Sequence, residues 1–380
     1  MKLKWGLSFV FFIVCLGFLT YSCYQNRVYD WDMPGYLGSV LSWENPDNPQ
    51  KVHQIVYSSI KKEASELEFH DIVAYNHANE VFAADYKAFD EQLPYYQIKL
   101  GFNVAVYALY KIGFSGPHSV LLVNIFSYFI AGLLLFYLVK FLFPSQYFLA
   151  PLVSLGILSL PPVKSMAENP TPDTFLFIFT LLFTINVLQN KNIWVRFIIL
   201  VCCVLIRPDY ILFAGTYLFA VIVFEFLYKS KKINYIAIIQ GVVLASIYLS
   251  IITYYHYPGW KDLFYDSFFY RRPVISAENA DFTAKRYLDF LFIKLINFKK
   301  ISLASIILLG TLFYVTKDKW TRILGVLFYA NIYIKFVFFP DSANLRFFIG
   351  FVILLFIVLL YAVSKNTMVS KSGKLRNFTI

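Results

Sequence analysis

Long apolar runs recur from one end of the chain to the other, and they limit the folds that this sequence can adopt. These runs are long enough to cross about 30 Å of hydrocarbon, for which an α-helix needs roughly 20 residues. Hydrophobic residues make up 59% of the 380 residues and charged residues only 15%, whereas about a quarter of the residues in soluble domains are charged. The alternation typical of barrel strands is absent. The sequence therefore predicts an all-α polytopic membrane protein.

The apolar runs predict about ten spans within a single integral-membrane domain, residues 1–380. The first run is interpreted as a span and not as a cleaved signal peptide. The segment 95–113 is amphipathic and carries two lysines, so we expect an interfacial helix there. The predicted spans cover roughly 5–23, 118–141, 145–161, 174–189, 193–206, 210–228, 233–253, 301–316, 320–338 and 345–364.

Basic residues are concentrated in alternate loops. One set of loops contains almost no acid and includes Lys140, Lys191, the cluster "KSKK" at 229–232 and the C-terminal tail. The positive-inside rule assigns this set to the cytoplasm. It also accounts for much of the net charge of +11 without a nucleic-acid partner. The other set is then extracytoplasmic, and it contains two long loops, 24–117 and 254–300.

Charged residues also gather at the span ends on this predicted outer side. Asp30 and Asp32 follow the first run in "YDWDMPGYLG", where Pro34 and Gly35 predict a turn. A charged residue at a span end is often simply solvated. Arg207, however, lies between two apolar runs, where an arginine needs a partner or a bound anion. The other outer motifs, "AENPTPD", "RPD", "YRRP" and "PDSANLR", contain Glu168, Asp173, Arg207, Asp209, Arg271, Arg272 and Arg346.

This set of side chains indicates chemistry on an anionic, lipid-borne substrate. A carboxylate at a junction between a span and a turn can act as the general base for an acceptor hydroxyl. Arginines at the membrane boundary can neutralise a phosphate leaving group. The four cysteines lie in or beside apolar runs without metal-binding spacing. No cofactor is predicted firmly, although the acids of the outer loops leave a divalent cation open.

The pattern resembles the C-type (GT-C) membrane glycosyltransferases, which include protein O-mannosyltransferase-like and aminoarabinose-transferase-like enzymes. The resemblance covers most of the chain as a sparse pattern. It consists of Asp32 after the first span, "LPYYQIKLGF" with Lys99 in the basic position, the proline-rich turn with Glu168 and Asp173, the Arg207–Pro208 step and the late Arg346–Phe347 pair. Many family members have adjacent Asp and Glu where this chain reads "DWD". The catalytic acid is therefore open between Asp32 and Asp30.

The resemblance implies a GT-C-like bundle with extracytoplasmic amphipathic helices, and it also implies a particular reaction. That activity is inverting transfer of a sugar from a polyprenyl-phosphate donor to an envelope acceptor, which is a lipid, a glycan or a protein. The site would face outward from the bacterial cytoplasmic membrane, with Asp32 as the base. The remaining predicted substrate-binding residues are Lys99, Glu168, Asp173, Arg207, Asp209, Arg271, Arg272 and Arg346, of which the cations would hold the phosphate.

Two other functions stay open at this stage. An oligosaccharide polymerase or ligase also uses outer-loop arginines, but its chemistry would be concentrated in one large late loop. Here the acids are concentrated in the first outer loop. A transporter would need polar residues at mid-membrane. The predicted spans are nearly free of charge at their centres, which favours chemistry at the outer face.

Overall fold

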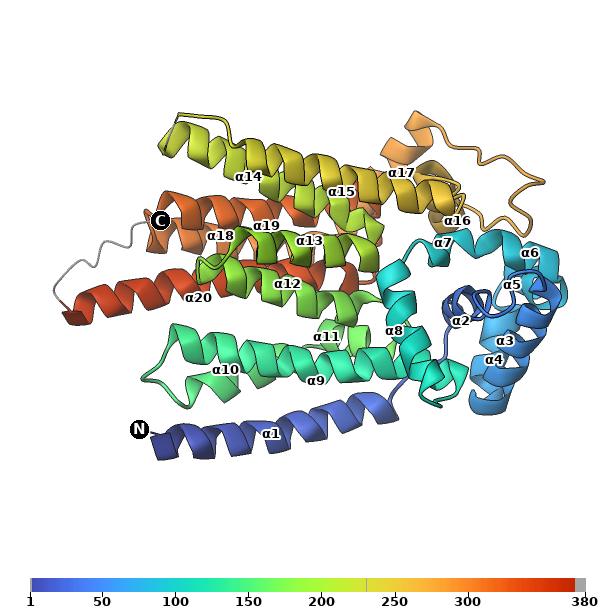
Figure 1. Cartoon of the computed structure of the whole chain (residues 1–380), viewed down its shortest axis with the longest axis horizontal. Helices are drawn as coiled ribbons and strands as arrows, with labels where there is room; N and C mark the ends of the chain where they lie inside the picture. The colour runs from blue at the N-terminus through green and yellow to red at the C-terminus, as the bar shows by residue number, and fades with distance from the viewer. Residues whose placement is uncertain (1, 230, 373–380) are drawn as a thin grey trace.

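The apolar runs form a bundle of roughly parallel helices (Figure 1). The computed structural model describes residues 2–229 and 231–372, and it contains no β-strand within these ranges. The predicted all-α polytopic membrane class is confirmed, and the part of the basic tail beyond residue 372 lies outside the described residues. The bundle helices are α1 (Lys2–Gln25), α9 (Gly116–Leu142), α10 (Leu149–Leu158), α12 (Asp173–Leu188), α13 (Ile193–Ile206), α14 (Ile211–Tyr228), α15 (Tyr235–Tyr254), α18 (Lys299–Val315), α19 (Lys319–Phe338) and α20 (Arg346–Ser372).

The number of membrane spans is lower than predicted. Within the described residues, six helices are long and apolar enough to cross a bilayer, and two bent helix pairs raise this number to eight at most. Helices α12 and α13 have only 16 and 14 residues. At 1.5 Å per residue they are about 24 and 21 Å long, which is less than the hydrocarbon thickness of about 30 Å. The prediction of about ten spans is therefore wrong, because it counted apolar runs without weighing their lengths.

The two bent pairs have local causes in the sequence. Helix α10 is followed by α11 (Pro161–Glu168) at an angle of 63°. Leu160 precedes Pro161 and has an extended backbone, because a residue before proline is disfavoured in the helical region. The second pair is α17 (Ala284–Asn297) and α18, which meet at 69° around Phe298. The ring of Phe298 is fully buried and packs on Phe336 and Phe348.

The short helices of both long loops lie at the same end of the bundle, opposite the start of α1 (Figure 1). Side-chain caps begin several of them, including a capping box in which Ser65 and Glu68 satisfy each other's backbone N–H groups. The segment 95–113 is not a span, because its main helix has only 12 residues. The end helices are α2 (Met33–Leu41), α3 (Pro49–Glu63), α4 (Glu66–Ala74), α5 (His77–Ala84), α6 (Tyr86–Gln92), α7 (Pro94–Gln97), α8 (Leu100–Lys111), α16 (Trp260–Phe268) and α17.

Close packing of α8 on the end of α13 predicts an effect of substitution at Gly101. A Cβ atom there would lie 2.9 Å from the Ile206 side chain and 3.1 Å from its backbone nitrogen. We expect Gly101→Ala to lower the free energy of unfolding by about 1–3 kcal/mol through overpacking. Thermal unfolding in detergent measures the change. The control is Gly215→Ala in α14, where a Cβ atom meets nothing within 4 Å; equal stability of the two variants would contradict the packing.

Candidate active site

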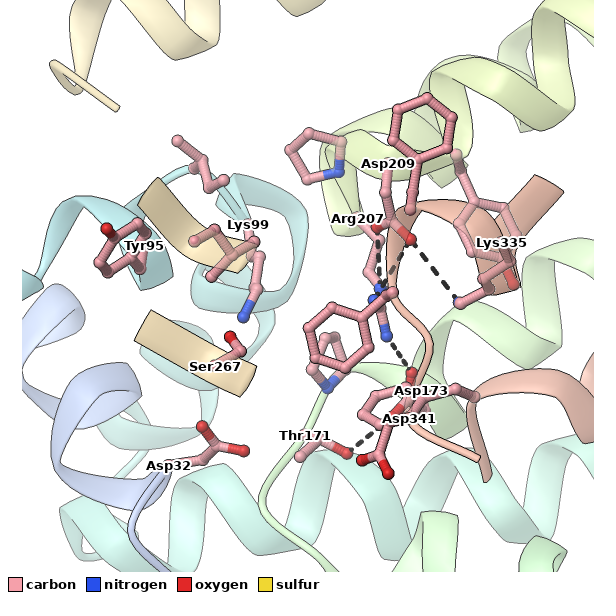
Figure 2. A pocket seen from close by; sticks show the side chains of 18 of the residues that line it. Asp32, Tyr95, Lys99, Thr171, Asp173, Arg207, Asp209, Ser267, Lys335 and Asp341 are labelled. Carbon is pink, nitrogen blue, oxygen red and sulfur yellow. Dashed lines mark hydrogen bonds and ion pairs between the residues drawn. The ribbon is translucent and has the colours of Figure 1, made fainter. Parts of the chain in front are cut away.

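A cavity of about 630 Å³ lies where the end helices meet the bundle. It brings together residues from distant parts of the sequence. All of the predicted site residues except Glu168 and Arg272 line it. Figure 2 shows Asp32 and Lys99 on one side of this pocket and Arg207, Asp209 and Lys335 on the other. The cavity residues that the sequence predicted are Asp30, Asp32, Lys99, Asp173, Arg207, Asp209, Arg271 and Arg346.

Four of the charged side chains form a chain of ion pairs across one wall. Arg207 contacts the carboxylate of Asp173, and its Nε lies 3.0 Å from Oδ1 of Asp209. The other Asp209 oxygen lies 3.6 Å from Nζ of Lys335. Thr171 donates a hydrogen bond of 3.1 Å to Asp173. We call Asp173, Arg207, Asp209 and Lys335 the charge chain. Its two cations and two carboxylates sum to zero.

The position of Arg207 follows from the proline after it. The residue before a proline is disfavoured in the helical region, and Arg207 has φ −144° and ψ 105°. Helix α13 therefore ends at Ile206, and a short 3₁₀ turn, η1 (Pro208–Tyr210), carries Asp209. Asp173 is the first residue of α12 and follows Pro172. These two proline breaks bring the acids and the arginine to the same end of the bundle.

Three other cations in the cavity have no carboxylate partner within 4.0 Å among the described residues: Lys99, Arg271 and Arg346. Lys99 donates a hydrogen bond of 2.7 Å to the hydroxyl of Tyr36. Arg271 donates one of 2.8 Å to Gln92. We call these three residues the unpaired cations. A cation removed from water is unfavourable unless an anion compensates it, so they provide an anion-binding surface.

Among the unpaired cations, Arg346 has the clearest need for a bound anion. It is the first residue of α20, only 9% of its side chain is accessible to solvent, and its Nε atom is buried without a hydrogen-bond partner. The ring of Phe347 lies 5.2 Å from its guanidinium carbon and 5.8 Å from that of Arg207. Among the described residues no ion pair is recorded for Arg346, so a ligand anion in the cavity would satisfy it.

Burial lowers the pKa of Lys99 to about 8, with Asp32 and the acids of the charge chain acting in the opposite direction. The residue lies between α7 and α8, outside the membrane-spanning helices. A lysine loses its charge as the pH rises through its pKa. Lys99 is therefore charged at neutral pH and becomes neutral in mildly alkaline solution.

The two acids of "DWD" lie in the cavity with different surroundings. Asp30 accepts a hydrogen bond of 2.9 Å from the backbone nitrogen of Asp32. Asp32 accepts one of 3.0 Å from the hydroxyl of Tyr96. Although Asp32 immediately precedes α2, its carboxylate does not cap that helix and is available to the cavity. Burial and the charge of Asp32 raise the pKa of Asp30 to about 7.

The rest of the cavity wall is largely apolar and aromatic. It includes side chains of α14, α15, α16 and α19, among them Ile211, Tyr248, Ile252, Leu263 and Phe338. Cavities that bind organic ligands typically combine such walls with a few placed polar groups. The geometry therefore suits an amphiphilic molecule, with its charged part at the charged side chains and its apolar part along the helices.

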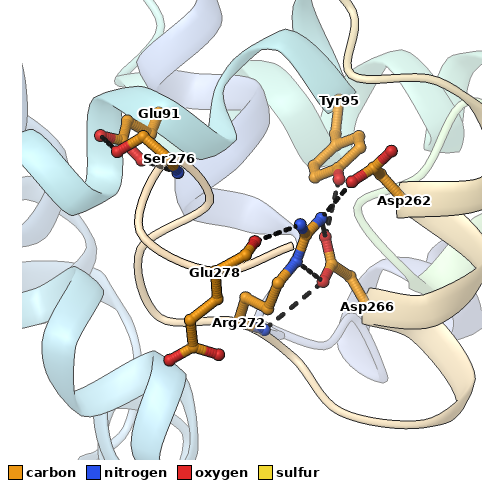
Figure 3. A network of polar contacts seen from close by, with 7 residues as sticks. All are labelled: Glu91, Tyr95, Asp262, Asp266, Arg272, Ser276 and Glu278. Atoms are coloured by element: carbon orange, nitrogen blue, oxygen red, sulfur yellow. Dashed lines mark hydrogen bonds and ion pairs between the residues drawn. The ribbon is translucent and has the colours of Figure 1, made fainter. Parts of the chain in front are cut away.

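Arg272 does not line the cavity, although two of its neighbours in the polar network of Figure 3, Tyr95 and Asp266, do. Its Nε and Nη2 donate hydrogen bonds of 2.8 and 2.9 Å to the two oxygens of Asp266, and Nη2 also donates to Asp262 at 2.8 Å. Tyr95 donates to Asp266 at 2.7 Å. These contacts fasten the second long loop to α7 of the first. Arg272 is thereby saturated by protein groups and has a structural role here.

Glu168 is the other predicted site residue that does not line the cavity. Its backbone oxygen accepts a hydrogen bond of 2.9 Å from the nitrogen of Val28. This contact ties the segment after α1 to the end of α11, and so supports the segment that carries Asp30 and Asp32. No group of three or more His, Cys, Asp or Glu side chains suited to a metal ion is found in the described part of the chain.

Sequence reasoning missed Tyr96 and Gln92, which bind Asp32 and Arg271. Both precede Lys99 in "QLPYYQIK". The pair of tyrosines beside a lysine was a signal, but it did not say which hydroxyl faces the acid. A side chain at Gly35 would test this placement, since a Cβ atom there lies 2.4 Å from the Tyr96 ring. The ring therefore fits against Asp32 only because position 35 carries no side chain.

The different surroundings of the two buried arginines predict different effects on stability. Arg272→Ala leaves Asp266, which is 3% exposed, without its cation, and breaking such a buried pair costs about 3–5 kcal/mol. Arg346→Ala removes a cation that has no carboxylate partner within the described residues, so we expect little loss or a small gain of stability. Thermal unfolding in detergent compares the two. A greater loss in Arg346→Ala than in Arg272→Ala would contradict this assignment.

Comparison of the chain with protein-family models, with curated proteins and with solved structures gave no match.

Proposed function

We propose that this protein is an inverting glycosyltransferase that moves a sugar from a polyprenyl-phosphate donor to a hydroxyl group of a cell-envelope acceptor. One observation carries the proposal: a single cavity combines the uncapped carboxylate of Asp32 with the unpaired cations. The carboxylate suits a general base. The cations suit the phosphate that leaves with the lipid. No metal ion or other cofactor is needed for this scheme.

The donor phosphate would bind to the unpaired cations and not chiefly to Arg207. Asp173 and Asp209 already compensate the charge of Arg207, whereas Lys99, Arg271 and Arg346 keep theirs for a ligand. An arginine can bind phosphate with two parallel hydrogen bonds. In this proposal Arg207 acts as a positioning residue that fixes the wall beside Arg346.

The chemical step follows from these roles. The acceptor hydroxyl attacks the anomeric carbon of the donor sugar, and its proton passes to Asp32. A new carbon–oxygen bond forms to the acceptor while the bond between the sugar and the phosphate oxygen breaks. The bonding electrons leave with the polyprenyl phosphate, whose added negative charge is stabilised by the unpaired cations. Attack from the face opposite the phosphate inverts the anomeric configuration.

The surroundings of the cavity support a lipid donor at the outer face. Its apolar wall, from α14, α15, α16 and α19, suits the carrier chain. The excess of lysine and arginine in the loops at the other end of the bundle supports an extracytoplasmic site by the positive-inside rule. Nucleotide-activated donors are made inside the cell, so a lipid-linked donor and the bacterial cytoplasmic membrane complete the proposal.

Replacement of the base tests the proposed reaction. Asp32→Asn keeps the shape of the side chain and removes its basicity, so we expect turnover to fall by about 10²- to 10⁴-fold while the donor still binds. The measurement is sugar transfer from a polyprenyl-phosphate donor by purified protein. Asp71→Asn, at an exposed position on α4, is the matched control and should retain activity.

The two acids give distinguishable outcomes in this assay. Asp30→Asn should reduce turnover less than Asp32→Asn, because Asp30 is engaged by the backbone of Asp32. Normal turnover in Asp32→Asn with loss in Asp30→Asn would transfer the role of base to Asp30. Normal turnover in both variants would refute the mechanism.

The lowered pKa of Lys99 predicts pH-dependent binding of the phosphate. The ammonium group is charged below its pKa, so binding of polyprenyl phosphate should weaken as the pH rises through about 8. Binding by Lys99→Arg should persist across this range because arginine stays charged. Lys99→Met should bind weakly at every pH. Equilibrium binding to purified protein in detergent measures all three, and an identical pH profile for the native protein and Lys99→Arg would exclude Lys99.

A further inference from the structure

Helix α17 exposes an apolar surface that the protein itself does not cover. None of its 14 residues is buried. Phe292 and Ile296 are 66% and 74% exposed, and three neighbours, Leu288, Ile293 and Leu295, are at least 44% exposed. This surface is concentrated in the second half of the helix. An exposed apolar surface of this kind, on a helix outside the core, is typical of a contact with a membrane or with another protein.

The connection to α18 places this surface next to the bilayer. Only Phe298 separates the two helices, and α18 exposes Leu303, Ile306 and Ile307 to the surroundings of the bundle. Helix α18 belongs to a bent pair that could cross a bilayer as one span, and these side chains would then face lipid. The exposed second half of α17 therefore continues a lipid-facing surface around a bend of 69°.

Charge also changes along α17 in the way expected of an interfacial helix. Its first turns carry the exposed side chains of Lys285, Arg286 and Asp289. Its second half carries one charged residue, the half-buried Lys294, and Lys299 and Lys300 are exposed at the junction with α18. Lysines at the boundary of an apolar surface can place their ammonium groups among lipid phosphates. Two exposed lysines beside an exposed apolar surface favour a bilayer over a protein partner, because phospholipids offer both hydrocarbon and phosphate groups.

We propose that the second half of α17 lies in the boundary layer of the membrane, with Lys299 and Lys300 bound to the phosphates of anionic phospholipids. The first half then rises into water. A helix of 14 residues is about 21 Å long, so a shallow tilt separates its ends by several ångströms in depth. The proposal does not depend on the chemistry suggested for the cavity.

This contact would also fix one wall of the cavity. The hydroxyl of Tyr287 donates a hydrogen bond of 2.9 Å to the backbone oxygen of Val337, near the end of α19. The ring of Tyr287 packs 5.6 Å from Trp260, and that of Phe290 packs 5.2 Å from Phe268. Trp260 and Phe268 line the cavity. Seating α17 on the bilayer therefore restrains the α16 wall.

Spin labels at three positions test the proposal in the full-length protein. Lys285→Cys, Phe292→Cys and Ile296→Cys are made with the four native cysteines replaced by alanine, and each is placed in nanodiscs that hold one protein molecule. At positions 292 and 296 we expect collisions with oxygen to exceed those with a water-soluble nickel chelate. At position 285 the order should be reversed. Preferential access of the nickel chelate at all three positions would overturn the proposal.

Lipid composition tests the role of the lysines. With phosphatidylglycerol added to phosphatidylcholine, the label at Phe292→Cys should move deeper, and Lys299→Gln with Lys300→Gln should abolish this shift. A shift that persists in the glutamine variant would refute the lysine contacts. Labels at 292 and 296 that are shielded from both reagents in single-copy nanodiscs would show that protein, not lipid, covers this surface, and would refute the membrane contact.

Discussion

The charge chain is the interaction on which the cavity depends. It joins residues from four places: Asp173 at the start of α12, Arg207 after α13, Asp209 in η1 and Lys335 in α19. Two cations and two carboxylates cancel, so these helix ends meet without net charge in a region where an isolated charge is most costly. Loss of any member would leave an uncompensated charge in this wall of the cavity.

Neutralisation of Arg207 decides which cations can serve a ligand. The sequence indicates that Arg207 is the residue that most needs a bound anion, because it is flanked by apolar runs. In the structure, Asp173 and Asp209 compensate the charge of Arg207, whereas Arg346 has a buried Nε atom without a hydrogen-bond partner. The unpaired cations therefore lie in the same cavity as Asp32, where they could bind an anionic ligand. An anionic headgroup on an apolar chain matches both the charges and the wall.

The sequence predicted which charged residues gather in one cavity better than it predicted the number of spans. Charged residues at the ends of apolar runs indicate which side chains meet in the structure, since helices that alternate in direction bring every second turn to the same end of a bundle. That rule correctly gathered Asp32, Arg207 and Arg346. It failed for Arg272, because the fold of a long loop decides which of two adjacent arginines turns to the cavity and which to Asp266. The number of spans was also overestimated. Composition shows that α12 and α13 are apolar, but their lengths of 16 and 14 residues become clear only when the structure shows where each helix begins and ends.

The short helices explain why the site lies where it does. Since α12 and α13 end before the full hydrocarbon thickness would be crossed, the space beyond α12 and α13 is filled by side chains of the loops and by the charge chain instead of by apolar helix. Charged groups can collect there, although the end helices shield them from bulk water, because Arg207 offsets the two acids. The same space is bounded by α14, α15 and α19, which also expose apolar side chains on the outside of the bundle. In the proposed reaction, the lipid headgroup would enter this polar cavity while its chain stayed among apolar helices, as chemistry on a membrane-bound molecule requires.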